Sequence, residues 1–275
     1  MYDNPLIDTD TLRSWLDADP APIVLDVRWR LGGPSLRSAY DAGHVPGAVF
    51  AEFDTDICGP PGAGGRHPLP DPAHLQAVLR RLGIDGGSRI VVYDGGDQLA
   101  ASRTWWTLRW AGLTEVYVLD GGFPAWTGPT DTAQPIPRAG DVVVRPGGMP
   151  LLDAAGAAAL AEKGVLLDVR TPDRYRGDAE PIDRVAGHIP GAVNLPNAEL
   201  GPDGRFAPAD QLRERFAAHG ATDGVDAGTY CGSGVTAART VLGMTVAGLR
   251  PALYVGSWSE WITNPDRPIA TATGG

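Results

Sequence analysis

The sequence contains two copies of the same series of short motifs, and this repeat constrains the fold more than any other feature. Leu25–Arg28 (Leu-Asp-Val-Arg) recurs as Leu167–Arg170, and Gly43–Val49 (Gly-His-Val-Pro-Gly-Ala-Val) recurs, with one change, as Gly187–Val193. The spacing between the copies drifts only slowly along the chain. Ordered matches of this kind are typical of a duplicated domain with small insertions and deletions.

Each half alternates apolar runs with amphipathic segments, which indicates strands alternating with helices. We therefore expect an α/β fold with two tandem domains, each a mostly parallel sheet flanked by helices. Residues 127–150 are rich in Pro, Gly, Thr and Asp and predict a linker, so the domains are expected at 1–126 and 151–275. In the first domain the expected helices are Thr11–Leu16, Ala73–Leu82 and Ser102–Ala111, and the expected strands are Pro22–Leu25, Arg89–Tyr93 and Val116–Leu119.

Composition narrows the classes of function. The 275 residues carry a formal net charge of −10, which argues against a nucleic-acid partner, although local arginines can still bind a small anionic substrate. No stretch has the apolar length of a membrane span, and the N-terminus lacks a signal-peptide pattern, so we expect a cytoplasmic protein without a membrane partner. Cys58 and Cys231 are the two cysteines, which excludes a disulfide framework and disfavours a zinc site. Cys58 has no obvious partner in the sequence.

The segment Thr229–Arg239 is the strongest candidate for a catalytic loop. Cys231 follows an expected strand and precedes Gly-Ser-Gly, and a helix is expected to start at about Val235 or Thr236. The glycines let the backbone curl so that N–H groups between Gly232 and Thr236 point at one spot, which also faces the positive end of the helix. Such surroundings favour the thiolate, the reactive form of a cysteine. An isolated cysteine is ordinarily a small buried apolar side chain, but Gly-Ser-Gly is a poor context for core packing.

The duplication provides an internal comparison for this loop. Opposite Cys231 the first half has Asp94, within Tyr93-Asp94-Gly95-Gly96-Asp97. A carboxylate cannot act as a sulfur nucleophile, so the first domain is expected to be catalytically silent. Ligand sites in parallel α/β sheets lie beyond the carboxyl ends of the strands, which is where Cys231 is expected.

Together these residues resemble the tandem rhodanese family of sulfurtransferases over essentially the whole chain. The resemblance rests on the two Asp-Val-Arg segments, the two Gly-His-x-Pro-Gly-Ala segments, the Cys231 loop and Gly256–Trp261. It implies that Cys231 takes a sulfane sulfur from a small anionic donor and becomes a persulfide. The sulfur then passes to a thiol, cyanide or protein-thiol acceptor, and no metal or organic cofactor is implied.

The loop sequence also suggests the donor. Thiosulfate-preferring members resemble Cys-Arg-Lys-Gly-Val-Thr, whereas Cys231–Thr236 (Cys-Gly-Ser-Gly-Val-Thr) resembles the 3-mercaptopyruvate branch. A loop without cations suits a donor with one carboxylate, which a single nearby guanidinium can bind. Carried over from that branch, Arg174 in Arg-Tyr-Arg-Gly would bind the donor carboxylate. The family's second arginine follows a Glu-Pro pair, but Ile182 stands there, so Arg184 is the expected replacement.

The same resemblance implies a Ser–His–Asp set that moves protons around the leaving pyruvate. Ser233, His67 and Asp56 match its three members, and two of them come from the first domain. The catalytic site is therefore expected to lie between the domains. His44 and His188 recur in both halves, as do Asp26 and Asp168, and are expected to be structural.

Three alternatives remain open at this point. A cysteine-dependent phosphatase needs Cys-x5-Arg, but the required position is Ala237, and Arg239 lies two residues too late. A persulfide carrier would load its cysteine once and then stall without turnover. A thiosulfate:cyanide sulfurtransferase is the third, since the two donors are often accepted by one enzyme of this kind.

Overall fold

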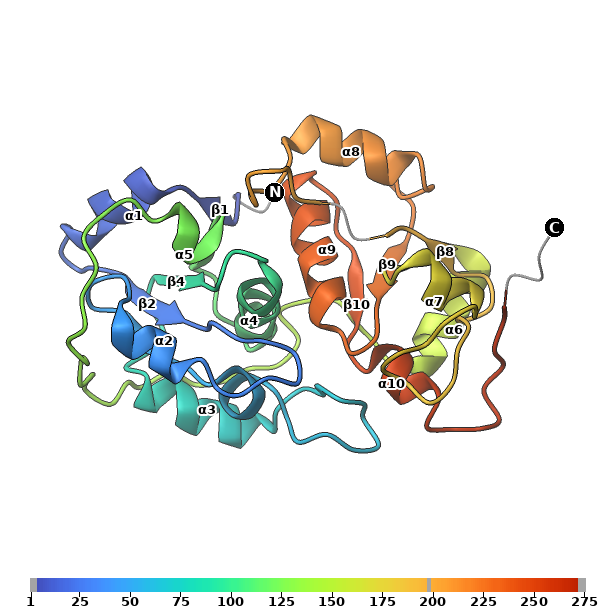
Figure 1. The fold of residues 1–275 in the computed structure, drawn as a ribbon, viewed down its shortest axis with the longest axis horizontal. Coiled ribbons are helices and arrows are strands. Elements are labelled where there is room, and N and C mark those ends of the chain that lie inside the picture. Colours follow the sequence, from blue (N-terminus) through green and yellow to red (C-terminus); the bar gives the residue numbers. More distant parts are fainter. Residues whose placement is uncertain (1–3, 197–198, 272–275) are drawn as a thin grey trace.

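The computed structural model describes residues 4–196 and 199–271. These residues form two α/β halves side by side, each around its own sheet (Figure 1). The elements of the first half are β1 (Leu6–Ile7), α1 (Thr9–Leu16), β2 (Ile23–Asp26), α2 (Arg37–Ala42), β3 (Val49–Phe50), the π-helical turn η1 (Phe53–Ile57), α3 (Pro72–Arg81), β4 (Ile90–Tyr93), α4 (Leu99–Trp110), β5 (Val116–Leu119) and α5 (Gly122–Ala125). Those of the second half are β6 (Leu151–Leu152), α6 (Ala154–Lys163), β7 (Val165–Asp168), α7 (Pro172–Arg176), β8 (Val193–Asn194), α8 (Ala209–Ala217), β9 (Ala227–Tyr230), α9 (Val235–Val246), β10 (Ala252–Tyr254) and α10 (Ser257–Trp261).

The two sheets have the same topology. Their strand orders are β1-β5-β4-β2-β3 and β6-β10-β9-β7-β8, and every described pairing is parallel. Asp26 lies opposite Tyr93 in the first sheet, as Asp168 lies opposite Tyr230 in the second. The predicted α/β class with two parallel sheets is confirmed. The domain boundaries at 126 and 151 stay a prediction, and residues 127–150 form no helix or strand.

Local capping explains where the first helices begin. The Asp8 carboxylate accepts a hydrogen bond from the Thr11 N–H at 2.7 Å, so α1 starts earlier than the sequence predicted. Asp71 caps α3 in the same way, and Pro72 occupies its first turn, where a missing N–H costs nothing. These two caps fix the start of the helices that precede β2 and β4.

In each half a buried ion pair fixes the loop that follows an inner strand of the sheet. This strand is β2 in the first half and β7 in the second. The Asp26 carboxylate accepts from the Arg28 guanidinium at 2.7 Å, and Arg170 donates to Asp168 at 2.6 Å. Each arginine also donates to the carbonyl of the glycine before the repeated histidine. Burial alone would lower the pKa of Arg170, but the Asp168 carboxylate outweighs burial and raises it.

The repeated histidines hold equivalent turns. His44 Nδ1 lies 2.8 Å from the Tyr40 carbonyl oxygen, and His188 Nδ1 lies 2.8 Å from that of Tyr175. Each imidazole also stacks on the ring of its tyrosine. The same contacts in both halves, including the half without a cysteine, agree with a structural role.

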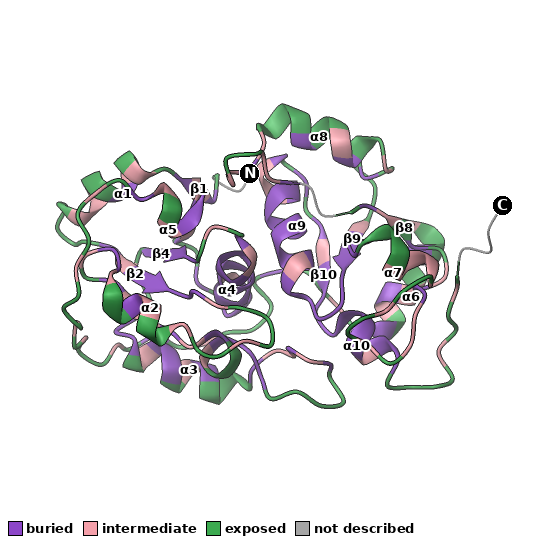
Figure 2. Cartoon of the chain, in the orientation of Figure 1, coloured by how far each residue is buried: buried purple, intermediate pink, exposed green. Residues whose placement is uncertain are grey.

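The hydrophobic core is continuous across the two halves. Helix α4 of the first half packs against α9 of the second, and both are buried along most of their length (Figure 2). Trp105 and Leu108 on α4 belong to the same cluster as Ala238 and Val241 on α9. None of the helices in the described ranges has the length and apolar character needed to cross a membrane.

Removing the buried carboxylate of the second half should destabilise the fold strongly. Asp168→Ala leaves the Arg170 charge buried without its main partner, and we expect a loss of about 3–5 kcal/mol in the free energy of unfolding. The matched control is Asp223→Ala, because the Asp223–Arg213 pair lies at the surface and should contribute at most about 1 kcal/mol. Urea denaturation of both variants measures the difference, and equal losses would contradict the assignment.

Candidate active site

Cys231 lies between the carboxyl end of β9 and the first turn of α9. Its side chain is buried, at 3% exposed, and Sγ accepts a hydrogen bond from the Gly234 N–H at 3.1 Å. Gly234 has a φ of +78°, and a Cβ there would lie 2.3 Å from the Val255 carbonyl oxygen, so this position requires glycine. The tight turn therefore aims the N–H that precedes the helix at the sulfur.

Helix α10 holds the Cys231 loop from the other side. The Cys231 N–H donates to Ser257 Oγ at 3.2 Å, and the carbonyl oxygens of Cys231 and Gly232 accept from the N–H groups of Trp258 and Ser259. These three bonds tie the backbone of Cys231 and Gly232 to α10. The motif Gly256–Trp261, noted in the sequence, thus acts by clamping the nucleophile's loop.

A cavity of about 280 Å³ opens at the sulfur. It is lined by Val169, Arg170, Thr171, Arg174, Pro196, Cys231, Gly232 and Thr236. Of the predicted backbone cradle, Gly232 and Thr236 line this cavity and Gly234 contacts Sγ, whereas Val235 packs into the core. A larger cavity of about 830 Å³ lies at the opposite, amino ends of β9 and β10 and does not include Cys231.

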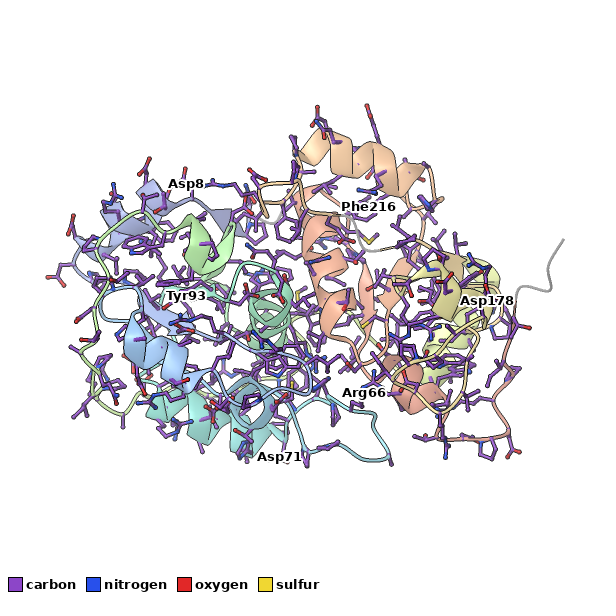
Figure 3. The ribbon with its side chains drawn as sticks, viewed as in Figure 1. Asp8, Arg66, Asp71, Tyr93, Asp178 and Phe216 are labelled. Carbon is purple, nitrogen blue, oxygen red and sulfur yellow. The ribbon has the colours of Figure 1, made fainter. Side chains whose placement is uncertain are left out.

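Two guanidinium groups lie over Gly232, next to the nucleophile. A Cβ at Gly232 would be 3.4 Å from Nη2 of Arg174 and 2.6 Å from Nη2 of Arg66. Arg174 sits on α7, whereas Arg66 comes from the loop between η1 and α3 of the first half (Figure 3). Both donate to the buried carboxylate of Asp183, Arg174 at 2.9 Å. Guanidinium groups from both halves therefore lie beside the Cys231 loop, each paired with a carboxylate.

A chain of polar side chains reaches the Cys231 loop from the first half. Ser233 Oγ lies 2.8 Å from His67 Nδ1, and His67 Nε2 lies 3.5 Å from Asp54 Oδ1. Burial and the positive charge of Arg103 lower the pKa of His67 to about 4. The imidazole is accordingly neutral at pH 7. The structure brings Ser233 and His67 together as the sequence predicted.

Arg103 on α4 is a further cation behind the loop. It is fully buried, its Nη2 donates to the His67 carbonyl oxygen at 2.9 Å, and its Nη1 lies against Gly234. Burial lowers the pKa of Arg103, while the thiols of Cys58 and Cys231 act in the opposite sense. Burial raises the pKa of Cys58 to about 12, which keeps that second thiol protonated and unreactive.

Known proteins share this architecture. The model of the rhodanese-like domain matches the chain twice, over residues 8–129 and 153–264. This chain belongs to the rhodanese family. A Pseudomonas aeruginosa rhodanese, provisionally named a 3-mercaptopyruvate sulfurtransferase, is 45% identical over 92% of this chain and 94% of its own length. SseB of Mycobacterium tuberculosis, provisionally named a thiosulfate sulfurtransferase, is 43% identical over 98% and 97%.

Solved structures agree with that membership. The crystal structure of the 3-mercaptopyruvate sulfurtransferase SseA from Escherichia coli has a TM-score of 0.81 and 28% identity, covering 94% of this chain and 100% of that one. The resemblance seen in the sequence is thus confirmed, and the protein is a sulfurtransferase. No cluster of three metal-ligating side chains occurs in the described ranges of this rhodanese.

Two predicted members of the rhodanese site lie elsewhere. The Asp56 carboxylate pairs with Arg81 at 2.6 Å and accepts from the Glu52 N–H, so Asp54 takes its predicted place beside His67. The cause is the π-helical turn, whose wider ring buries Phe53 and Ile57 and turns Asp54 toward the imidazole. Arg184 donates to the Ile262 carbonyl oxygen at 2.5 Å and does not line the Cys231 cavity. The second guanidinium that lies over Gly232, beside that of Arg174, belongs to Arg66, although Arg66 is not among the residues that line the cavity.

Arg239 does not face the Cys231 loop. It donates to the Asp97 carbonyl oxygen at 2.6 Å and pairs with Glu199 at 3.4 Å. Arg239 therefore does not close over the Cys231 loop as the arginine of a cysteine-dependent phosphatase would, as the sequence had indicated. Arg66, Asp54 and Arg103 were not predicted, because their distances from the Cys231 loop depend on how the two halves pack; the Gly65-Arg66-His67 sequence beside the predicted histidine was a signal for Arg66.

The neutral state of His67 predicts a pH dependence of stability. The pKa of His67 falls from 6.5 to about 4 on folding, so its stabilising contribution is complete above pH 6.5 and is lost as the pH falls toward 4. Between pH 7 and pH 5 we expect the wild type to lose about 2 kcal/mol more than His67→Gln, which cannot titrate there. Urea denaturation at both pH values tests this, and parallel losses in the two proteins would contradict it.

Proposed function

We propose that the enzyme transfers the sulfur of 3-mercaptopyruvate through a persulfide on Cys231 to a thiol, cyanide or protein-thiol acceptor. The observation that carries this proposal is the cavity at Cys231, in which Arg174 on α7 is placed for the carboxylate of a small donor. The loop itself contributes no cation, which suits a monoanionic donor. The relatives named for 3-mercaptopyruvate support the same choice.

The chemistry balances without a cofactor. The Cys231 thiolate attacks the donor sulfur, a sulfur–sulfur bond forms, and the carbon–sulfur bond breaks with its electron pair left on the pyruvate carbon. The proton that leaves the donor thiol is the proton that this carbon needs. Ser233 Oγ and His67 Nδ1, 2.8 Å apart, can pass that proton on because the imidazole is neutral at pH 7. The Asp54 carboxylate, 3.5 Å from His67 Nε2, is near enough to serve as the third member of such a set.

The second half-reaction restores the enzyme. The acceptor's nucleophile attacks the outer sulfur of the persulfide, and the bond to Cys231 breaks to leave the thiolate. The Gly234 N–H, which donates to Sγ at 3.1 Å, stabilises the negative charge that returns to this sulfur. The acceptor can reach the sulfur through the cavity at Cys231, which Arg174 also lines.

We assign the nucleophile to a catalytic domain at residues 151–275. The domain at residues 1–126 is assigned as catalytically silent, because it has no nucleophile of its own. The Asp94 carboxylate fills the corresponding loop of the first half by accepting from Gly96, Gln98 and Ala101. The first domain nevertheless supplies His67, Asp54 and Arg66, so the proposed site needs both. Both cysteines are free thiols, which suits the reducing cytoplasm that we propose as its compartment.

A thiosulfate:cyanide sulfurtransferase is the second candidate. The two guanidinium groups over Gly232 favour it, since a pair of cations can bind a dianion, and SseB of Mycobacterium tuberculosis carries that name. Asp183 neutralises part of this charge, and for that reason we place mercaptopyruvate first. A carrier without turnover is the third candidate and is separated from both by the kinetics below.

The donor preference is measured as kcat/KM for 3-mercaptopyruvate and for thiosulfate, with cyanide as acceptor. We expect mercaptopyruvate to be favoured about a hundredfold or more, equivalent to ~2.7 kcal/mol in the transition state. A preference for thiosulfate would contradict the proposed donor. A single loading of sulfur followed by no turnover would identify a carrier.

Replacing the nucleophile should abolish transfer while leaving the fold intact. Cys231→Ser keeps a small polar side chain in the loop but cannot form a persulfide, so we expect turnover to fall to background with both donors. Mass spectrometry after donor treatment should show one added sulfur on the wild type and none on the variant. Cys58→Ser is the control and should keep full activity; residual turnover in Cys231→Ser would refute the mechanism.

A further inference from the structure

Asp183 is a buried carboxylate held between two arginines of the proposed donor site. Its side chain is 4% exposed, and it pairs with Arg66 of the first half and with Arg174, the latter at 2.9 Å. Both guanidinium groups lie over Gly232, the residue after the nucleophile. Asp183 thus occupies the cationic position beside Cys231 at which the carboxylate of a donor is expected.

Glu180, the other acid at this place, is held differently. Its carboxylate accepts from the N–H groups of Ile182 and Asp183 as well as from Arg174. Burial raises its pKa, but Arg174 and these N–H groups outweigh burial and lower it. In the described ranges the Asp183 carboxylate is instead bonded to the two arginines and to no backbone N–H. Glu180 is a fixed part of its loop, whereas Asp183 depends on the two cations alone.

Arg66 is positioned to bind a ligand in addition to the Asp183 carboxylate. Its backbone N–H donates to Ser259 Oγ at 3.1 Å, and Gly65, with φ +98°, lies so close to the Gly256 carbonyl oxygen that a Cβ would be 2.8 Å from it. The backbone of Arg66 is therefore fixed against α10, beside the Cys231 loop (Figure 3). Its Nε is buried and has no hydrogen-bond partner in the described ranges. A buried donor without an acceptor is unfavourable, and a bound oxyanion would satisfy it.

We propose that Asp183 is an internal stand-in for the donor carboxylate, and that Arg66 is the second arginine that binds that carboxylate. The inference rests on the proposed function, because it concerns the same site. With Asp183 in place, Arg66 and Arg174 are balanced by Asp183 and Glu180, and a donor must exchange with Asp183 to gain both cations. The exchange is anion for anion, so the buried charge is the same before and after.

The chain around Asp183 permits such an exchange. Residues 178–186 form neither helix nor strand, and the neighbouring Ile182 is 47% exposed. Rotation of Asp183 toward solvent therefore breaks no sheet or helix hydrogen bond. The contact also crosses between the halves, so donor binding would replace the Asp183–Arg66 link by a donor–Arg66 link and keep the halves joined.

Binding without turnover tests the proposal directly. Calorimetric titration of the Cys231→Ala enzyme with 3-mercaptopyruvate, and separately with thiosulfate, reports affinity in the absence of reaction. In that background Asp183→Asn should tighten mercaptopyruvate binding about tenfold, because the competing anion is gone. Arg66→Gln should weaken binding about tenfold or more, and Arg66→Lys should recover only part of the loss because lysine lacks the bidentate fork.

Matched variants separate these effects from net charge and folding. Asp178→Asn makes the same change in charge, but Asp178 pairs with exposed Arg176 on the outer side of the second half, so binding should be unchanged (Figure 3). Arg184→Gln, which removes an arginine outside the cavity, should also have no effect. Asp183→Ser repeats the test should the asparagine variant unfold. Unchanged or weaker binding in both Asp183 variants, or unchanged binding in Arg66→Gln, would overturn the proposal.

The outcome is distinguishable from failure of the proposed donor. If thiosulfate binds and mercaptopyruvate does not, the proposed function fails; the Asp183 and Arg66 variants must then shift thiosulfate affinity as above, and no shift overturns the inference. If neither anion binds any variant, the stand-in is overturned as well. Turnover of the wild type with mercaptopyruvate, combined with no dependence on Arg66, would keep the function and reject this inference alone.

Discussion

The packing of α4 against α9 is the contact on which the rest of this structure depends. Helix α9 begins immediately after the Cys231 loop, so its position sets the direction of the sulfur. Because α4 and α9 share one buried cluster, the first half cannot shift without moving the nucleophile's helix. The same contact brings the His67 and Arg66 loop against α10 and the Cys231 loop. A site built from two halves therefore rests on one shared core.

The two halves carry equivalent loops, one with the Asp94 carboxylate and the other with the Cys231 thiol. In each half, the residue before the helix has left-handed backbone, Gln98 with φ +58° and Gly234 with φ +78°. The N–H of Gln98 donates to the Asp94 carboxylate, and the N–H of Gly234 donates to Cys231 Sγ. Asp94 takes up two further N–H groups, and burial together with Asp97 raises its pKa to about 7. A carboxyl group that fills its own anion site leaves no room for a substrate, whereas a single sulfur atom does.

Sequence alone gave the architecture and the nucleophile because both depend on local patterns. The repeat of Asp-Val-Arg fixes two equivalent sheets, and Cys-Gly-Ser-Gly before a helix fixes the loop. Ser233 and His67 were also found, through the resemblance to the rhodanese family. Asp54 was missed because the resemblance was carried over by position in the sequence, which matched Asp56 to the family's aspartate, whereas the carboxylate beside His67 in the folded turn is that of Asp54. Arg66 was missed because its distance from Gly232 depends on how the halves pack, and no spacing within one chain segment encodes that distance.

The charges of the site act on more than the donor. The chain as a whole carries −10, yet the guanidinium groups of Arg66, Arg103 and Arg174 lie around the Cys231 loop, so the grouping of cations there is a local property. Arg103 and Arg66 also contribute to lowering the pKa of His67, after burial itself. The cations that attract a carboxylate thus keep the imidazole from holding a positive charge. An imidazole with a pKa of about 4 retains no added proton at pH 7. This suits the proposed reaction, in which the proton of the donor thiol ends on the carbon of the product.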